Sequence, residues 1–304
     1  MKVREAWVGT KKQLAHSAVG DASIEAEALL RHTLNMNRAQ FFAGLDDDLD
    51  VSHDVVIAAL AERRIGGEPL AYILGSREFY GLDFYMDAGA LIPRQETELL
   101  VEMVLEFSSE RPQQDLVVAD VGTGSGAIAV AIASHLDRAT VYATDASHEA
   151  LLVADINRRR HRVEDRVHLL HGDLADALPV SVDAIVSNLP YLRSDQMVSI
   201  PEELRREPSQ ALDGGADGLD TVRRLLRQAP NHMRPAGRLV IEIAPEQLNS
   251  VFAIGRDIFP TADLSSTRDL LGLDRAVVIQ LPRTRDSSRN HGPAPLIQSV
   301  HSGN

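Results

Sequence analysis

The chain has 304 residues, of which 44% are hydrophobic and 25% are charged, as is usual for a globular protein. A formal net charge of −13 argues against electrostatic binding of nucleic acid, and the lack of cysteine excludes disulfides, thiolate nucleophiles and cysteine-ligated zinc. The length favours one large domain and one smaller domain. The sequence shows no signal-peptide pattern and no apolar run near the ~20 residues of a membrane span, so we expect a cytoplasmic protein.

Residues 1–75 are expected to form a small helical domain. Apolar residues recur with helical spacing in residues 24–34 and again in residues 55–60. Between them, Asp46-Asp47-Asp48 is interpreted as a solvated turn rather than a cation site.

The period of the pattern changes at about residue 76. Aromatic and apolar side chains alternate around Gly81 within residues 78–92, which predicts a β-hairpin. We therefore expect residues 76–95 to link two domains. After Pro93 a helix is predicted, and Glu96 and Glu98 suit its positive N-terminal end.

From residue 116 onward, short apolar runs alternate with helical stretches. The expected strands cover residues 116–121, 140–144, 166–171, 182–187, 238–243 and 275–281. The expected helices lie near residues 126–136, 147–160, 218–230 and 246–257. This alternation predicts an α/β fold with a parallel sheet between helices, in which ligands bind beyond the carboxyl ends of the strands. This domain is placed at residues 96–283, and the polar tail 284–304 is expected to be disordered.

A glycine-rich loop follows the first of these strands and opens a helix. Its residues are Gly122, Thr123, Gly124, Ser125 and Gly126. Glycines let the backbone pass close to a ligand, and the start of a helix offers unpaired N–H groups. The spacing also fits a dinucleotide site through Ala127, so the loop predicts a nucleotide-like ligand, with a tight turn as the alternative.

Carboxylates follow the next two strands. Asp145 can accept both hydroxyls of a ribose, which fits S-adenosylmethionine and NAD equally, although an Asp here also suits the cap of the next helix. Asp173 can contact an adenine amino group while Leu174 packs on the ring. As an isolated residue, Asp173 would more often belong to a turn.

The sequence Asn188-Leu189-Pro190-Tyr191 follows the strand expected at residues 182–187. The Asn oxygen and the next backbone carbonyl can each accept one N–H from a planar, uncharged nitrogen, and the tyrosine offers a flat face. Such a site can turn the delocalised lone pair of an amide toward an electrophile. No nearby residue serves the proton transfer of a nicotinamide dehydrogenase. The combined pattern therefore favours methyl transfer from a sulfonium donor, for which the protein mainly aligns the two reactants.

Other motifs add little. No H-x-x-x-H or H-E-x-x-H pair is present, so no metal site is expected. Ser125 lacks the G-x-S-x-G frame of a hydrolase nucleophile. Glu242, at the end of a predicted strand, is assigned no role.

Over roughly residues 20–282 the chain resembles the HemK/PrmC family of protein-(glutamine-N5) methyltransferases, which modify the Gly-Gly-Gln loop of peptide-chain release factors. The resemblance rests on the glycine loop, on Asn-x-Pro-Tyr and on further stretches in family order. These stretches are residues 67–75, 79–82, 91–94, 96–102, 207–208, 211–215 and 217–219.

The resemblance implies a helical substrate-recognition domain, a hairpin linker and a Rossmann-like, seven-stranded S-adenosylmethionine-dependent methyltransferase domain. It implies that S-adenosyl-L-methionine is bound by the glycine loop with Asp145, Leu174 and Asn188, and Asp173 joins them as a candidate. Asn188, Pro190 and Tyr191 are the candidate catalytic residues. Residues 188–191 would hold the acceptor glutamine, with Arg94 as a further candidate for substrate binding. The implied partner is a release factor, and neither a membrane nor direct binding of nucleic acid is expected.

Leu189 and Gln95 stand where the family usually has proline. Leucine keeps the carbonyl that accepts the second hydrogen bond, but it lacks the fixed φ of proline. Its branched side chain can crowd the glutamine or accommodate another acceptor. The leading hypothesis is methylation of a release-factor glutamine. The alternatives are the same chemistry on another protein glutamine or on a small-molecule or peptide amide or amine, and a degenerate protein that binds S-adenosylmethionine without turnover. DNA adenine methylation is disfavoured by the acidic charge.

Overall fold

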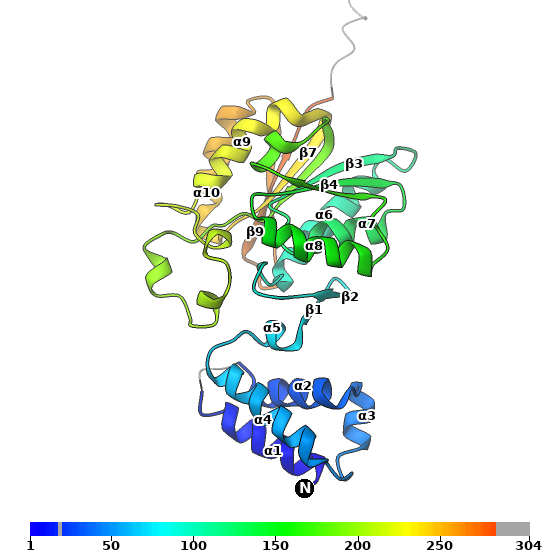
Figure 1. Ribbon diagram of the computed structural model, residues 1–304. Coiled ribbons are helices and arrows are strands. Elements are labelled where there is room, and N and C mark those ends of the chain that lie inside the picture. The colour runs from blue at the N-terminus through cyan, green and yellow to red at the C-terminus, as the bar shows by residue number, and fades with distance from the viewer. Residues whose placement is uncertain (18–19, 284–304) are drawn as a thin grey trace, which may run out of the picture.

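The computed structural model describes residues 1–17 and 20–283. A helical part at the N-terminus is joined through a short hairpin to a larger α/β part (Figure 1). The disorder expected for residues 284–304 concerns a segment outside the described residues.

Five helices form the N-terminal part. They are α1 (Val3–Leu14), α2 (Ala22–Leu34), α3 (Arg38–Ala43), α4 (Val51–Ile65) and α5 (Leu70–Leu74). Asp21 caps α2 through a 2.8 Å bond from the backbone N–H of Ser23. The helical spacing was expected to point Val55 and Val56 inward, but both are exposed and α4 buries Ile57 and Ala61 instead. The apolar run of α4 is wider than the face that the small bundle can cover.

The predicted hairpin is present between the two parts. Strands β1 (Ser76–Phe79) and β2 (Leu82–Tyr85) pair antiparallel on either side of Tyr80-Gly81. Phe79 and Phe84 are fully buried against the α/β core, so the hairpin is packed as part of the larger unit. After a 3₁₀ turn, η1 (Gln95–Thr97), the predicted helix begins as α6 (Glu98–Ser109).

A seven-stranded sheet in the order β5-β4-β3-β6-β7-β9-β8 forms the centre of the larger part. Its strands are β3 (Leu116–Val121), β4 (Ala139–Asp145), β5 (Val167–His171), β6 (Val182–Ser187), β7 (Met233–Glu242), β8 (Asp263–Arg268) and β9 (Asp274–Gln280). Strands β3 to β7 run parallel, and β9 runs antiparallel to both of its neighbours. The Rossmann-like, seven-stranded fold is thereby confirmed.

Helices cover both faces of this sheet (Figure 1). They are α6, α7 (Ala127–His135) and α8 (His148–Arg160) on one face, and α9 (Asp220–His232) and α10 (Leu248–Ile258) on the other. Because side chains alternate along a strand, Val118 of β3 joins the first apolar layer and Ala119 joins the second. Both layers are apolar, which explains why the strands read as continuous hydrophobic runs.

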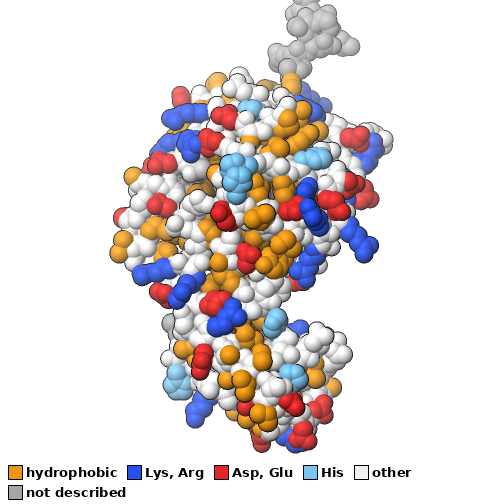
Figure 2. Space-filling model, in the orientation of Figure 1, with side chains coloured by type: hydrophobic (Ala, Val, Ile, Leu, Met, Phe, Trp, Pro, Cys, Tyr) orange, Lys and Arg blue, Asp and Glu red, His pale blue; other side chains and the backbone are white. Residues whose placement is uncertain are grey.

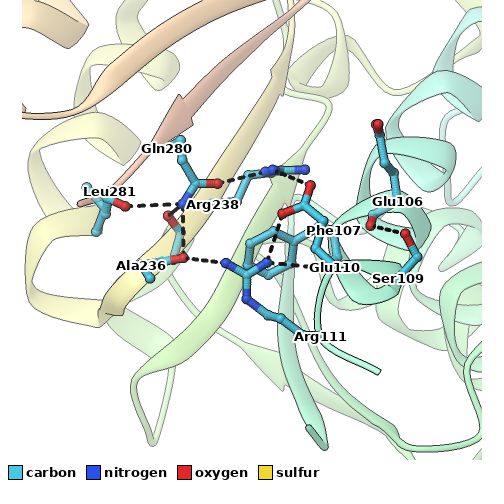
Figure 3. A network of polar contacts seen from close by, with 10 residues as sticks. Glu106, Phe107, Ser109, Glu110, Arg111, Ala236, Arg238, Gln280 and Leu281 are labelled. Carbon is cyan, nitrogen blue, oxygen red and sulfur yellow. Dashed lines mark hydrogen bonds and ion pairs between the residues drawn. The ribbon is translucent and has the colours of Figure 1, made fainter. Parts of the chain in front are cut away.

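The end of α6 is fastened to the sheet by a polar network (Figure 3). Arg238 of β7 pairs with Glu110 at 2.9 Å and donates to Gln280 of β9 at 2.9 Å. Arg111 and Arg238 both lie over the ring of Phe107, with guanidinium carbons 3.7 and 4.7 Å from its centre. These contacts stabilise one end of the sheet. The carboxyl ends of the parallel strands lie at the other end.

Acidic and basic side chains are interspersed on the face drawn in Figure 2, with apolar side chains gathered between them on both parts. Within residues 1–17 and 20–283, no helix combines the length and the apolar character needed to cross a membrane.

Candidate functional site

A cavity of about 250 Å³ opens at the carboxyl ends of β3, β4 and β6. The strand order reverses between β3 and β6, so the cavity lies at the switch point of the sheet, where α/β proteins bind ligands. Its lining includes most of the residues selected from the sequence. These are Gly122, Thr123, Gly124, Ser125, Asp145, Asp173, Leu174, Asn188, Leu189 and Pro190.

The glycine loop is held close to the sheet and to α8. The backbone N–H groups of Gly122 and Thr123 both donate to the carbonyl of Thr144 at 2.9 Å. Gly126 has φ +80°, and a Cβ there would stand 3.1 Å from the Cβ of Ala154 on α8. Only glycine meets both conditions without displacing α8, so Gly126 supports the loop although it does not line the cavity.

Asn157, near the C-terminal end of α8, fixes the loop from behind. Its side-chain amide donates to the carbonyl of Ser125 at 2.9 Å and to the carbonyl of Tyr85 at 3.1 Å. Its oxygen accepts the backbone N–H of Tyr85 at 2.7 Å. One buried amide thus joins the glycine loop to strand β2 of the hairpin.

The Asp145 carboxylate is oriented by backbone N–H groups. One oxygen accepts from Gly124 at 2.8 Å and the other accepts from Ser147 at 2.9 Å. Burial raises the pKa of the Asp145 carboxyl, and these hydrogen bonds oppose that effect. Each oxygen keeps a lone pair toward the cavity, where a vicinal diol is a matching ligand.

A second carboxylate, Asp120, lies beneath the loop and was not singled out from the sequence. One oxygen accepts the Thr123 hydroxyl at 2.6 Å and the backbone N–H of Ala129 at 3.1 Å. Its other oxygen is buried and accepts no hydrogen bond from the described residues. Burial raises the pKa of the Asp120 carboxyl to about 7.

Asp173 and Leu174 lie on the opposite wall. The Asp173 carboxylate is half exposed and pairs with Arg224 of α9, which also lines the cavity. Arg224 was not expected at the site. Leu174 is buried and has φ +51°, a left-handed conformation that is costly for a leucine. That conformation turns the chain so that Leu174 forms an apolar wall beside Asp173.

Asn188 follows β6 at the mouth of the cavity. Its side-chain nitrogen donates to the hydroxyl of Thr97 at 3.0 Å. The Thr97 hydroxyl in turn donates to Glu242 at 2.7 Å. The Asn188 side-chain oxygen accepts no hydrogen bond from residues 1–17 and 20–283, so its lone pairs are available to a ligand.

The next three residues face different surroundings. Leu189 is only 3% exposed, and its side chain belongs to the apolar layer that contains Leu174. Its Cδ2 is 3.0 Å from the position that a Cβ on Gly122 would occupy. Pro190 lines the cavity. Tyr191 is half buried, does not line the cavity, and has its pKa raised by burial.

Arg94 is engaged elsewhere. Its guanidinium pairs with Glu207, which also accepts the backbone N–H of Ile92 at 2.9 Å. Arg94 is absent from the described lining of the cavity. The pair holds the turn that leads into η1, and thereby places Thr97 beside Asn188.

The residues fit a small ligand that carries a nucleoside. The loop allows close approach, Asp145 can accept a diol, and Leu174 and Ile128 provide apolar walls. Among the residues that the structure describes, no three His, Cys, Asp or Glu side chains are grouped so as to hold a metal ion.

Two family models match the chain. Residues 5–75 match the PrmC N-terminal domain, and residues 95–217 match the methyltransferase small domain. Relatives named release factor glutamine methyltransferase are similar along nearly the whole chain. The protein of Moorella thermoacetica is 40% identical over 276 residues, which are 90% of this chain and 97% of that one. The protein of Coxiella burnetii is 35% identical over 280 residues, which are 91% of this chain and 98% of that one.

The fold also matches solved structures. A methyltransferase from Pyrococcus furiosus superposes with a TM-score of 0.50 at 18% identity, covering 74% of this chain and 99% of that one. At this identity the similarity concerns the fold alone.

Proposed function

We propose, because the chain belongs to the family of release factor glutamine methyltransferases, that it methylates the side-chain amide nitrogen of the glutamine in the Gly-Gly-Gln loop of a peptide-chain release factor. The chain is a methyltransferase by family and by fold.

The proposed cofactor is S-adenosyl-L-methionine, which supplies a methyl group bonded to a positively charged sulfur. Asp145 accepts the ribose hydroxyls, since its two oxygens are already oriented by Gly124 and Ser147. The glycine loop passes under the ligand, and Leu174 packs on the base. The Asp173 carboxylate is shared between the base and Arg224.

The proposed acceptor site is formed by residues 188–191. The Asn188 oxygen and the backbone carbonyl of Leu189 each accept one N–H of the glutamine amide, which leaves the nitrogen lone pair directed into the cavity. Pro190 and Tyr191 shape the entry. With both N–H groups held, the nitrogen would be aligned with the methyl group of the donor, and alignment is the main contribution that a protein makes to such a transfer. The N–C bond would form as the S–C bond breaks, so that the sulfur leaves as a neutral thioether, and the amide proton would leave to solvent afterwards.

We propose that the three parts of the chain have the roles expected from the sequence. Residues 1–75 recognise the release factor, residues 76–95 link the parts, and residues 96–283 carry out the transfer. Because Arg94 is paired with Glu207, we propose that Arg94 shapes the site and does not contact the glutamine directly.

One observation supports this proposal most strongly. The Asn188 side-chain nitrogen donates to Thr97, while its oxygen has no hydrogen-bond partner among the described residues, and Asn188 lines the same cavity as the glycine loop and Asp145. An acceptor of N–H groups therefore lies beside a pocket suited to the methyl donor.

The test is to incubate the purified chain with labelled S-adenosyl-L-methionine and a purified release factor, followed by mass spectrometry of the Gly-Gly-Gln peptide. We expect one methyl group on the glutamine side chain. Asn188→Ala should lower kcat by about a hundredfold or more, because the amide is no longer aligned. A release factor with Gln→Glu in the loop serves as the acceptor control. Labelling at another residue, or no transfer despite cofactor binding, would overturn the proposal.

A further inference from the structure

Three side chains from distant parts of the sequence form a linear relay at the site. Asn188 donates to Thr97 at 3.0 Å, and Thr97 donates to Glu242 at 2.7 Å. Thr97 is 3% exposed and Glu242 is 2% exposed, so the bond between these two side chains is shielded from water. The relay joins η1 before α6, the end of β6 and the end of β7.

The chemistry of the hydroxyl makes this relay directional. A threonine hydroxyl has one proton to donate and lone pairs to accept with. An ionised Glu242 can only accept, so the Thr97 proton must point toward Glu242. Only lone pairs then remain toward Asn188. Asn188 must present its NH₂ group to Thr97, and its oxygen must face the opposite way, into the cavity.

We propose that Thr97 and Glu242 are positioning residues that fix the amide of Asn188 with its oxygen toward the acceptor nitrogen, and that this requires Glu242 to be ionised. The inference rests on the proposed function for its acceptor but concerns two residues that act through the side chain of Asn188. Glu242 acts only through Thr97, and Thr97 acts only through Asn188.

Protonation of Glu242 reverses the direction of both hydrogen bonds. A neutral carboxyl can donate its proton to the Thr97 oxygen, which frees the Thr97 hydroxyl to donate to the Asn188 oxygen. The amide then turns its NH₂ group toward the acceptor, where two N–H donors face each other. No bond is made or broken in this change except the proton gained by Glu242 from solvent.

The surroundings of Glu242 place this change near neutral pH. Burial, with a smaller contribution from the nearby Glu96, raises the pKa of the Glu242 carboxyl, and the net value is about 7. The Thr97 hydrogen bond, Arg275 of β9 and Arg94 oppose the rise of this pKa. Arg275 is itself paired with Asp269 at 2.9 Å, and the Tyr191 hydroxyl is the remaining titratable neighbour. With Glu242 ionised above this range, kcat rises as the pH increases through about 7.

The kinetic test uses Thr97→Val, Thr97→Ser and Glu242→Gln with the release factor as substrate. Valine keeps the shape and removes the hydroxyl, and kcat is expected to fall about ten- to hundredfold, as for loss of a charge-assisted hydrogen bond. Serine should restore most of that loss. Glu242→Gln should give a similar fall at pH 8 and abolish the rise of kcat with pH. The KM for the cofactor should change by less than about threefold, since no partner of Asp145 is altered.

A spectroscopic readout tests the relay without a substrate. The side-chain NH₂ resonances of Asn188, identified by their loss in Asn188→Ala, should shift between pH 5.5 and 8.5 with a midpoint near 7. The shift should persist in Thr97→Ser and vanish in Thr97→Val and Glu242→Gln. Asp183→Asn, which neutralises a buried carboxylate at the opposite end of β6, should lower the melting temperature and leave the shift unchanged.

The outcomes separate the two proposals. If the wild-type chain does not methylate a release factor but Asn188 titrates through Thr97, the proposed function fails and the relay stands. If methylation occurs and either the Asn188 resonances are independent of pH or Glu242→Gln keeps the wild-type pH profile, the relay is wrong.

Discussion

Leu189 shows how one residue can alter a site through its backbone rather than through its side chain. Its side chain is buried in the apolar layer below the glycine loop and close to Gly122. The sequence suggested that the Leu189 side chain could crowd the glutamine, but the freedom of the Leu189 backbone is more important. The carbonyl of Leu189 is the proposed second hydrogen-bond acceptor for the glutamine amide.

Leu189→Pro is expected to raise kcat about two- to tenfold, because fixing φ preorganises that carbonyl. The same change should lower the free energy of unfolding by about 2 kcal/mol or more, since a buried leucine is lost. Leu189→Ala is the matched control, with the same loss of packing but a free φ. Steady-state kinetics and urea denaturation measure both effects. A kcat for Leu189→Pro no higher than that of Leu189→Ala would refute the preorganisation argument.

Asp120 makes the stability of the chain depend on pH. Its carboxyl has a pKa of about 7 when folded and an ordinary value of 3.8 when exposed. Between these values the folded chain holds a proton that the unfolded chain has released. The stability from this group is therefore complete below about pH 4 and is lost as the pH rises to about 7.

Asp120→Asn removes this contribution, so the decrease in the free energy of unfolding between pH 5 and pH 8 should become smaller. Denaturation with urea at both pH values measures it. Glu242 also has a pKa raised to about 7, so Glu242→Gln should reduce the decrease independently, and the double variant should reduce it most. An unchanged pH dependence in Asp120→Asn would show that this carboxyl is ionised in the folded chain throughout.

Residue patterns predicted the site where its parts are local in sequence. Asn188 and Asp145 were found because each follows a clear buried strand, and the structure brings them to one cavity. The pairing of Thr97 with Glu242 spans 145 residues and could not be found this way. Arg94 carried a motif signal, but only the three-dimensional contact with Glu207 shows what its guanidinium binds.

At the scale of elements, the segment around Gly214 and Gly218 supports residues 190–192, which follow Asn188 and Leu189. The backbone N–H of Gly214 donates to the carbonyl of Leu192 at 2.7 Å. Gln247 bridges the carbonyls of Tyr191 and Gly218, each at 3.1 Å. A Cβ on Gly218 would stand 2.2 Å from the Tyr191 carbonyl oxygen, a distance that no side chain can occupy.

Gly218→Ala is therefore expected to displace residues 190–192. This should lower kcat about tenfold or more, because a shift of about 1 Å is costly for a reaction that depends on alignment, and it should affect cofactor affinity less. Gly272→Ala is the control. Gly272 has a similar φ of +79°, but no atom lies within 4 Å of the position that its Cβ would take, so this substitution carries the conformational cost alone. Kinetics and calorimetric cofactor binding compare the two. Equal effects of both substitutions on kcat would contradict the close-packing argument.

The strands of the sheet were predicted where both faces are buried and missed where they are not. Strand β8 lies at an edge and reads Asp-Leu-Ser-Ser-Thr-Arg, which has no buried residue in the structure and no apolar run. Strand β7 begins at Met233, five residues before the predicted start, because Pro235 and Gly237 resemble a break in the sequence. In both cases the strand forms because it pairs with a neighbouring strand. That pairing cannot be recognised from the local amino-acid composition.

At the scale of the whole molecule, the segment from Pro201 to Glu207 holds the helical part against the catalytic part. Arg64 of α4 is 3% exposed and binds Glu25 of α2 at 2.6 Å and Glu203 of this segment at 2.9 Å. Arg206 donates to the carbonyl of Gly66 at 3.0 Å. Glu207 then binds Arg94 beside the site, so a continuous set of contacts runs from α2 to the turn before Thr97.

Glu203→Gln should weaken this connection while leaving the Arg64–Glu25 pair in place. We expect a higher KM for the intact release factor, with little change for a short peptide that contains Gly-Gly-Gln, because in the proposed function only the larger substrate contacts both parts. Glu62→Gln is the charge-matched control, since Glu62 of α4 is exposed and its side chain forms no ion pair among the described residues. Parallel kinetics with both substrates provide the measurement. A KM that rises equally for protein and peptide would indicate a defect in the site instead.

Asn157 connects the hairpin with the glycine loop through a single side chain. Its amide pairs with both backbone groups of Tyr85, as a neighbouring strand would, and with the carbonyl of Ser125 in the loop. The Tyr85 amide proton therefore exchanges with solvent only when this contact opens. We expect that a ligand in the cavity stiffens the loop and slows that exchange, so the exchange rate of a backbone proton outside the cavity should report whether the cavity is filled.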